Sequence, residues 1–467
     1  MFRPIGAALA IGAALVAAHP AFAVTDEELT ELREQVRQLK EQYERRIEAL
    51  EQRLRRAELA AGSAQAEAAR PQTEVVRATA RVVGEDAYNP GISLILNGTY
   101  ANLSRNPAGF RIGGFVPTLG AVEPPARGLR LAESELVISA GVDPDFRGTL
   151  IAALAPGGGV EVEEAHVERI GLANGLNLKA GRFFSSLGNL NQVHAHAWDF
   201  ADASLAQKAF LAGRLAEEGV QMKWVAPTDI YFDLGVELGR GRSFPGADRS
   251  KNGIGAGVIF ANIGGDIGAS HAWKAGLSYL GTRADNRSYD ETDSTGTVVN
   301  NSFNGTSRLW VLDGIMKWAP GGNPIERNLK LQGEYFRRIE DGDFTYDTAA
   351  ASLGTRTGGF ASRQSGWVVQ GVYQFAPRWR VGYRHDRLDS GSTGIGLVYS
   401  GVRTAADFPV LASYGPSRNT LMADWSPSEF SRVRLQFARD RSRRDAIDSQ
   451  IVVQYVMSMG AHGAHRF

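Results

Sequence analysis

The 467-residue sequence contains no cysteine. This absence excludes disulfide bonds, thiolate metal sites and cysteine nucleophiles, and with them a small extracellular scaffold held together by disulfides. An excess of charge of one sign is also missing, because acidic and basic residues balance at 51 each. Nucleic acid is therefore not an expected partner.

Long apolar runs are absent after the first residues. At the start, Arg3 precedes an apolar stretch from Ile5 to Ala18, and the small-x-small triplet Ala21-Phe22-Ala23 follows. This combination is typical of a secretory signal peptide. We expect a signal peptide at residues 1–23 and a mature chain from Val24. Because a membrane-spanning helix requires about 20 apolar residues, we expect no helical anchor.

Residues 24–59 are highly charged, and their apolar residues recur at steps of three and four. The recurring positions are Leu29, Leu32, Val36, Leu39, Tyr43, Ile47, Leu50 and Leu54. This spacing predicts a helical coiled coil, with a solvated single helix as the alternative. Residues 60–87, which are rich in Ala, Glu and Arg and contain Pro71, are expected to be a linker.

From residue 88 to 467 the hydrophobic period changes to two, which is typical of β-strands with two different faces. One face carries apolar residues bracketed by aromatics, as in Trp310, Leu312, Met316 and Trp318. The opposite face carries charges, as in Arg380, Arg384 and Asp386, which a dry core could not bury unpaired. The pattern predicts an all-β fold, namely a transmembrane β-barrel with lipid outside and water inside.

Sixteen antiparallel strands fit the alternation, an even number as bacterial barrels require. They are expected near 92–103, 131–142, 146–155, 160–171, 176–184, 219–226, 229–238, 254–264, 273–283, 307–318, 327–338, 366–376, 378–387, 418–428, 431–440 and 449–467. Short turns follow the even strands. Long loops follow most odd strands, at 104–130, 185–218, 239–253, 284–306, 339–365 and 388–417. We therefore expect periplasmic turns, outer loops and a periplasmic N-terminus.

The last strand alternates Ile451, Val453 and Tyr455 with polar residues, and Phe467 ends the chain. A terminal alternating strand closed by Phe resembles the assembly signal of outer-membrane barrels. The resemblance implies that Phe467 is an assembly signal read by the barrel assembly machinery.

Together these features resemble the phosphate-selective porin O and P family. The resemblance rests on the signal peptide, the coiled coil, the sixteen strands, Phe467 and the run Leu178-Lys179-Ala180-Gly181-Arg182-Phe183. It implies a homotrimer of water-filled barrels in the outer membrane of a Gram-negative bacterium, with the coiled coil in the periplasm. It also implies ion transport by passive diffusion of small hydrophilic or ionic solutes, anions such as phosphate among them. The third outer loop, residues 185–218, would fold into the lumen as a constriction.

Two groups of residues are candidates for the pore. The constriction candidates on the third loop are His194, His196, Asp199, Asp202, Lys208 and Arg214. By strand parity the wall candidates are Lys179, Lys223, Lys330, Arg380, Arg384, Arg432 and Arg434, opposed by Asp233, Glu237, Asp313, Glu334 and Asp424. These charges either set ion selectivity or form structural pairs. Since the loop also contains Glu217 and Glu218, its acidic residues outnumber Lys208 and Arg214, and phosphate specificity stays open.

Four alternatives remain. His194 and His196 share one face of an extended segment, and His462 and His465 lie near the end of the chain. A metal site also needs a third ligand and fixed geometry, which the sequence does not show, so we assign no metal site and no cofactor. Gly-x-Ser-x-Gly is absent and the histidines are scattered, so we assign no catalytic residue and expect no enzyme. An energy-coupled or metal-linked uptake receptor would need about 22 strands and a plug. A tether based on the helical segment is the last alternative.

Overall fold

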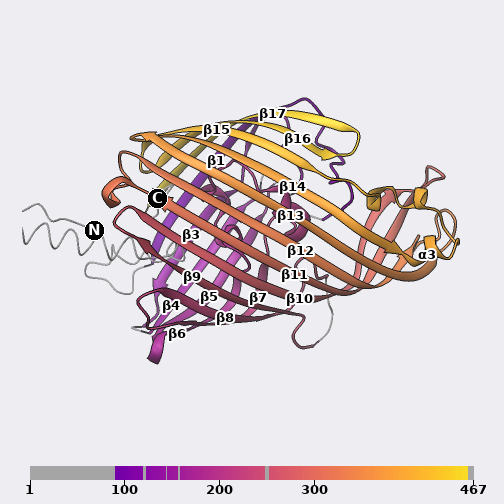
Figure 1. The fold of residues 1–467 in the computed structure, drawn as a ribbon, viewed down its shortest axis with the longest axis horizontal. Coiled ribbons are helices and arrows are strands. Elements are labelled where there is room, and N and C mark those ends of the chain that lie inside the picture. Colours follow the sequence, from indigo (N-terminus) through magenta and orange to yellow (C-terminus); the bar gives the residue numbers. More distant parts are fainter. Residues whose placement is uncertain (1–89, 119–121, 144, 156–157, 248–251, 461–467) are drawn as a thin grey trace, which may run out of the picture. The chain divides into compact units, whose positions relative to one another are not determined.

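The computed structural model describes residues 90–118, 122–143, 145–155, 158–247 and 252–460. The expected signal peptide, coiled coil and linker at residues 1–87 lie outside these residues. The expected assembly signal Phe467 also lies outside them. The described residues form the barrel and its loops (Figure 1).

The described chain forms one antiparallel sheet closed on itself. Its strands are β1 Gly91–Leu103, β2 Gly128–Leu131, β3 Ser134–Gly141, β4 Phe146–Leu154, β5 Val160–Leu172, β6 Leu176–Phe184, β7 Ala216–Val225, β8 Tyr231–Gly239, β9 Ala256–Ile267, β10 His271–Thr292, β11 Val298–Trp318, β12 Asn328–Tyr346, β13 Arg356–Ala376, β14 Trp379–Ile395, β15 Ser417–Ser428, β16 Ser431–Arg443 and β17 Ala446–Gly460. The pairing of β1 with β17 and with β3 closes the barrel.

The barrel has sixteen strands around its circumference, although seventeen segments carry strand labels. Both β2 and β3 pair with β1, and only Ala132 and Glu133 separate them. They are therefore two parts of one interrupted strand. Each of the sixteen strands expected from the alternation is present, which confirms the predicted fold class and strand number.

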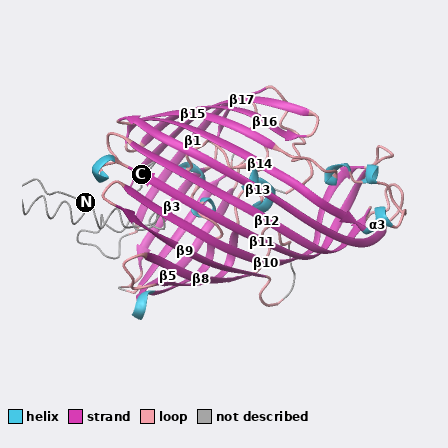
Figure 2. Cartoon of the chain, in the orientation of Figure 1, coloured by secondary structure: helices cyan, strands magenta, loops and turns pink. Residues whose placement is uncertain are grey.

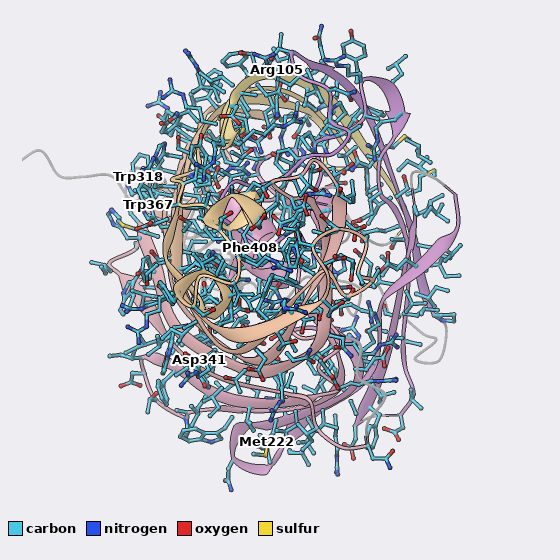
Figure 3. The ribbon with its side chains drawn as sticks, turned by 90° about the vertical axis from the view of Figure 1, so that its right-hand side faces the viewer. Arg105, Met222, Trp318, Asp341, Trp367 and Phe408 are labelled. Atoms are coloured by element: carbon cyan, nitrogen blue, oxygen red, sulfur yellow. The ribbon has the colours of Figure 1, made fainter. Side chains whose placement is uncertain are left out.

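Side chains alternate between the two faces as the period-two pattern predicts. Along β11, Trp310, Leu312 and Met316 are exposed on the outer face, and Leu312 is 55% exposed. Charged residues face inward, and Arg434 on β16 is only 1% exposed. Viewed along the barrel, Met222 and Trp367 lie outside the ring of strands and Phe408 lies within its outline (Figure 3). Apolar side chains thus cover the outside and charged side chains line the inside, which is the reverse of the arrangement in a water-soluble protein.

The turns and loops differ in length at the two ends of the barrel. One end of the barrel has short turns, such as residues 226–230 and 377–378. The other end has longer connections, at residues 104–127, 185–215, 240–255 and 396–416. This agrees with the expected alternation. The described helices are also short, among them α2 Leu205–Leu211 and α3 Gly396–Tyr399, and none has the length and apolar character needed to cross a membrane (Figure 2).

The prediction of long loops at 284–306, 339–365 and 388–417 is partly wrong. Strands β10 to β14 continue beyond the apolar belt into these regions, so that the turn between β10 and β11 is reduced to residues 293–297 (Figure 1). An apolar cluster that includes Phe303, Phe344, Phe360 and Phe408 supports this extension. The outer parts of these strands are hydrogen-bonded to their neighbours and need no apolar outer face. Their sequence is therefore polar and resembles that of a loop.

Candidate functional site

The third outer loop, residues 185–215 between β6 and β7, folds into the barrel. Its start is bound to the inner wall by carboxylates. Ser185 Oγ donates a hydrogen bond of 2.6 Å to Glu237 on β8, and the Leu190 amide donates one of 2.6 Å to Glu334 on β12. Glu237 and Glu334, which strand parity had placed on the pore wall, thus act as loop anchors.

Gly188 allows this part of the loop to approach the wall closely. Its φ of +75° lies in the left-handed region that favours glycine. A Cβ at this position would lie 3.1 Å from Val311 Cγ1 and 3.2 Å from the Glu334 carboxylate. The chain therefore turns against β11 and β12 at a residue that has no side chain to displace.

The loop's helix α2 occupies an apolar part of the barrel interior, and all seven of its residues are buried. Its N-terminus has a capping box, in which Ser204 Oγ accepts from the Gln207 amide at 3.1 Å. Phe210 stacks on Phe336 of β12 with ring centroids 5.6 Å apart, and it meets Phe115 of the first outer loop edge-on at the same distance. These contacts fix α2 across the lumen.

Before α2, the loop bears two carboxylates that face the arginine-rich wall of β14 to β16. Asp202 pairs with Arg384 at 3.1 Å, with Lys208 at 3.3 Å and with Arg418, and it accepts a hydrogen bond of 3.1 Å from Gln436. Burial disfavours the carboxylate, but these cations outweigh it and hold the pKa of Asp202 well below its usual range. The loop is thereby bound to three strands by one side chain.

Asp199 forms a second ionic anchor. Its carboxylate lies 2.5 Å from Lys330 Nζ and 3.7 Å from Arg380 Nη1. Burial raises the pKa of Asp199, but Lys330 and Arg380 lower it by more, so that the pKa is about 2. Arg432 and Arg434 extend this anchor by donating to the carbonyls of His196 and Trp198 at 2.5 and 3.0 Å.

The histidines on the same loop face an acidic part of the wall. His196 Nδ1 lies 2.8 Å from Glu135 Oε1, and His194 Nδ1 lies 3.1 Å from both Glu135 and Glu163. Burial lowers the pKa of His194, but these carboxylates outweigh the effect and raise the pKa well above its usual value. The loop thus presents acid to the basic wall and histidine to the acidic wall.

All six constriction candidates lie on this loop inside the barrel. Their side chains are mostly buried in contacts with the wall, and Arg214 pairs with Glu163 at 2.7 Å. The wall candidates face inward, and Lys330, Arg380, Arg384, Arg432 and Arg434 contact the loop. Lys179 pairs with Glu168 at 2.8 Å. Lys223 lies on β7, paired in register with Asn177 and Gly235.

A group of inward lysines lies close to the turn end of the barrel. Its members on the described strands are Lys179, Lys223, Lys274, Lys317 and Lys330, each within three residues of the strand end at the short turns. Lys317 and Lys330 are direct cross-strand neighbours, and Lys274 Nζ donates to Asn189 of the loop at 2.8 Å. Lys274, Lys317 and Arg418 were not among the residues predicted from the sequence, although the same alternation marks them as inward.

The fold and the reversed polarity of its faces define a transmembrane β-barrel of the outer-membrane type, with one loop packed in its interior. No family model matches the sequence. An uncharacterized protein of Aquifex aeolicus is 30% identical over 362 residues, which cover 73% of this chain and 70% of the relative. The chain belongs to the family of that Aquifex protein.

Solved structures of similar fold include outer-membrane proteins. OmpT of Vibrio cholerae is 12% identical with a TM-score of 0.48, over 81% of this chain and 99% of OmpT. OprB of Pseudomonas putida is 13% identical with a TM-score of 0.46, over 83% and 96% of the two chains. The channel DcaP of Acinetobacter baumannii is 10% identical with a TM-score of 0.45, over 80% and 99%.

Proposed function

We propose that this protein is an outer-membrane porin, through which small hydrophilic or ionic solutes diffuse passively. The observation that carries the proposal is a closed barrel with an apolar exterior, an ionised interior and a loop bound across that interior. An apolar exterior is stable in lipid, and fixed charges on a narrowed lumen bias which ions pass. No chemical step is required of any residue.

The lysine group favours anions over cations. On three neighbouring strands, Lys274, Lys317 and Lys330 project into the same part of the lumen, and Lys330 is paired with Asp199. Fixed positive charge at a constriction raises the local concentration of anions and lowers that of cations. We therefore infer that small anions, phosphate among them, pass more readily than cations of equal size.

Reversal potentials in a planar bilayer with a KCl gradient test this preference. The wild-type protein should show a potential of the sign expected for chloride selectivity. The double variant Lys274→Gln/Lys317→Gln should shift it toward zero, whereas Arg308→Gln, which removes an exposed outer-face charge, should not. Cation selectivity of the wild type, or no shift in the double variant, would contradict the inference.

The remaining parts of the proposal follow from the family resemblance. They are a homotrimer, a periplasmic coiled coil and assembly through Phe467. Native mass spectrometry of the detergent-purified protein should give three chains per particle. The uptake receptor is not favoured, since the described barrel has sixteen strands and such receptors have about 22.

A further inference from the structure

Three residues that are far apart in the sequence meet inside the barrel, where their side chains offer ligand atoms to one point. They are Glu135 on β3 and His194 and His196 on the third loop, and their ligand atoms all lie within 4.8 Å of one another. All three residues are buried. The sequence alone lacked a third ligand for the two histidines, and the fold supplies it from a strand about sixty residues earlier.

The distances between these atoms are close to the spacing that a tetrahedral ion requires. Zinc bonds of about 2.0–2.1 Å at tetrahedral angles place neighbouring ligand atoms about 3.3 Å apart. Here His196 Nδ1 lies 2.8 Å from Glu135 Oε1, and His194 Nδ1 lies 3.1 Å from Glu135 Oε2. Because the three ligand atoms lie within 4.8 Å of one another, an ion would draw them together by at most about 1.5 Å.

The surrounding contacts resemble the outer shell of a metal site. A metal-bound histidine almost always donates its second ring N–H to a carboxylate or carbonyl. The second ring nitrogen of His194, Nε2, lies 3.4 Å from Glu164 Oε1. Arg214 pairs with one oxygen of Glu163 at 2.7 Å, while the other oxygen faces His194. Both groups are thus oriented by a neighbour.

The cluster is also rich in carboxylates. Glu135, Glu163 and Glu164 contact His194, and Glu133 lies close to Glu135 and Glu163. Arg214 balances one of these carboxylates. Buried carboxylates are costly without compensation. A protonated His194 supplies one positive charge, and a divalent ion bound by two neutral imidazoles would supply two.

From this geometry we propose that Glu135, His194 and His196 bind one Zn²⁺ ion inside the barrel. Two imidazoles and one carboxylate, with water in the fourth position, are a donor set that suits zinc. The ion joins the third loop to β3, while Asp199 and Asp202 join the loop to β12 and to β14 to β16. It is a structural ion that fixes the constriction, independent of which solute passes.

Elemental analysis of purified full-length protein provides the first test, and it needs no variant. After a chelator and then dialysis against ZnCl₂, the wild type should hold about one zinc ion per chain. His196→Gln and Glu135→Gln should each weaken zinc binding by at least about 100-fold in calorimetric titration at pH 8, because each removes a direct ligand. Glu164→Ala should weaken it about 10- to 100-fold, because it removes the partner of His194.

Two controls separate this site from other histidines. His385→Gln, which alters an outward-facing histidine bonded to Asn419, should leave zinc binding unchanged. His462→Gln/His465→Gln should also retain the ion. Wild-type protein without stoichiometric zinc, or zinc lost in the His462/His465 variant and kept in His196→Gln, would overturn the proposal. A folded barrel after each substitution is verified by its heat-dependent shift in gel mobility.

A second readout reports what the ion does. Trypsin should cut after Lys208 or Arg214 faster in chelated protein than in zinc-loaded protein, since both residues lie on the loop that the ion joins to the wall. Equal cleavage rates would overturn the structural role. Zinc content and conductance are measured separately. A protein without zinc can therefore still prove to be a channel, and failure of the zinc proposal does not decide the channel proposal.

Discussion

At the scale of single residues, charge inside this barrel is organised by pairing between loop and wall. Asp202 contacts cations from β14, β15 and its own loop, namely Arg384, Arg418 and Lys208. Removing one member of a buried ion pair leaves its partners uncompensated, which costs about 3–5 kcal/mol. The position of the loop therefore depends strongly on this one carboxylate.

We expect Asp202→Asn to detach the loop without opening the barrel. The loss of about 3 kcal/mol should appear as faster tryptic cleavage after Lys208 and as larger current noise in the open channel. Asp266→Asn, which alters an exposed carboxylate at the turn end of β9, serves as the matched control. Identical cleavage and noise in the two variants would show that Asp202 is not an anchor.

The low pKa of Asp199 and Asp202 predicts how the loop responds to acid. A carboxyl group with a lowered pKa in the folded state stabilises that state at neutral pH, and the contribution disappears as the pH falls through the folded value. For Asp199 that value is about 2. The difference in current noise between the wild type and Asp202→Asn should therefore stay constant from about pH 7 to about pH 4. A difference that is already lost at pH 5 would contradict this assignment.

Alternation along each strand was sufficient to predict which residues face inward. It identified Arg380, Arg432 and Arg434 correctly, and applied more fully it would also have identified Lys274 and Lys317. It could not predict that Arg432 and Arg434 donate to loop carbonyls. These partners depend on the path of a loop without periodic structure, and parity contains no information about that path.

At the scale of elements, the interior of the barrel has an apolar part as well as an ionic one. Helix α2 packs its Phe210 between Phe115 and Phe336, and Leu309 and Val311 of β11 belong to the same cluster. The strand pattern concealed this cluster, because a few inward apolar residues among polar ones resemble ordinary variation. Only the loop that covers them explains their presence.

Phe210→Ala should loosen α2. Truncation of a buried phenylalanine costs about 3–5 kcal/mol, and here the loss falls on a loop whose ends remain attached to β6 and β7. We expect a higher and noisier single-channel conductance, with the heat-modifiable barrel band retained on gels. Phe375→Ala, at a lipid-facing position of β13, should leave conductance unchanged. An unaltered conductance in Phe210→Ala would show that α2 does not narrow the pore.

The elements also show where sequence reasoning was incomplete. All sixteen strands were predicted, but the outer parts of β10 to β14 were assigned to loops. Segments such as Asn300-Asn301-Ser302 are polar on both faces, so no alternation of apolar residues marks them as strand. Their strand structure is stabilised by long hairpins and by a separate aromatic cluster around Phe344 and Phe408, which requires contacts distant in sequence.

At the scale of the whole molecule, the outer surface determines where the barrel is stable. Leu312 and Thr306 lie on the same outward face of β11, with Trp310 between them. Arginine at the bilayer centre of a barrel costs about 2–4 kcal/mol, whereas near the interface it costs about 0–1 kcal/mol. Leu312→Arg should therefore reduce folding into lipid vesicles, and Thr306→Arg should not. Equal folding yields would contradict the proposed lipid-facing belt.

Single-channel recording of the purified protein in a planar lipid bilayer shows whether the barrel is an open pore. If a closed barrel with a wet, loop-narrowed interior spans the bilayer, the current should rise in discrete, uniform steps and vary linearly with small applied voltages. If protein that is folded, as shown by its heat-modifiable gel mobility, and inserted in the bilayer gives no such steps, the barrel is not an open pore.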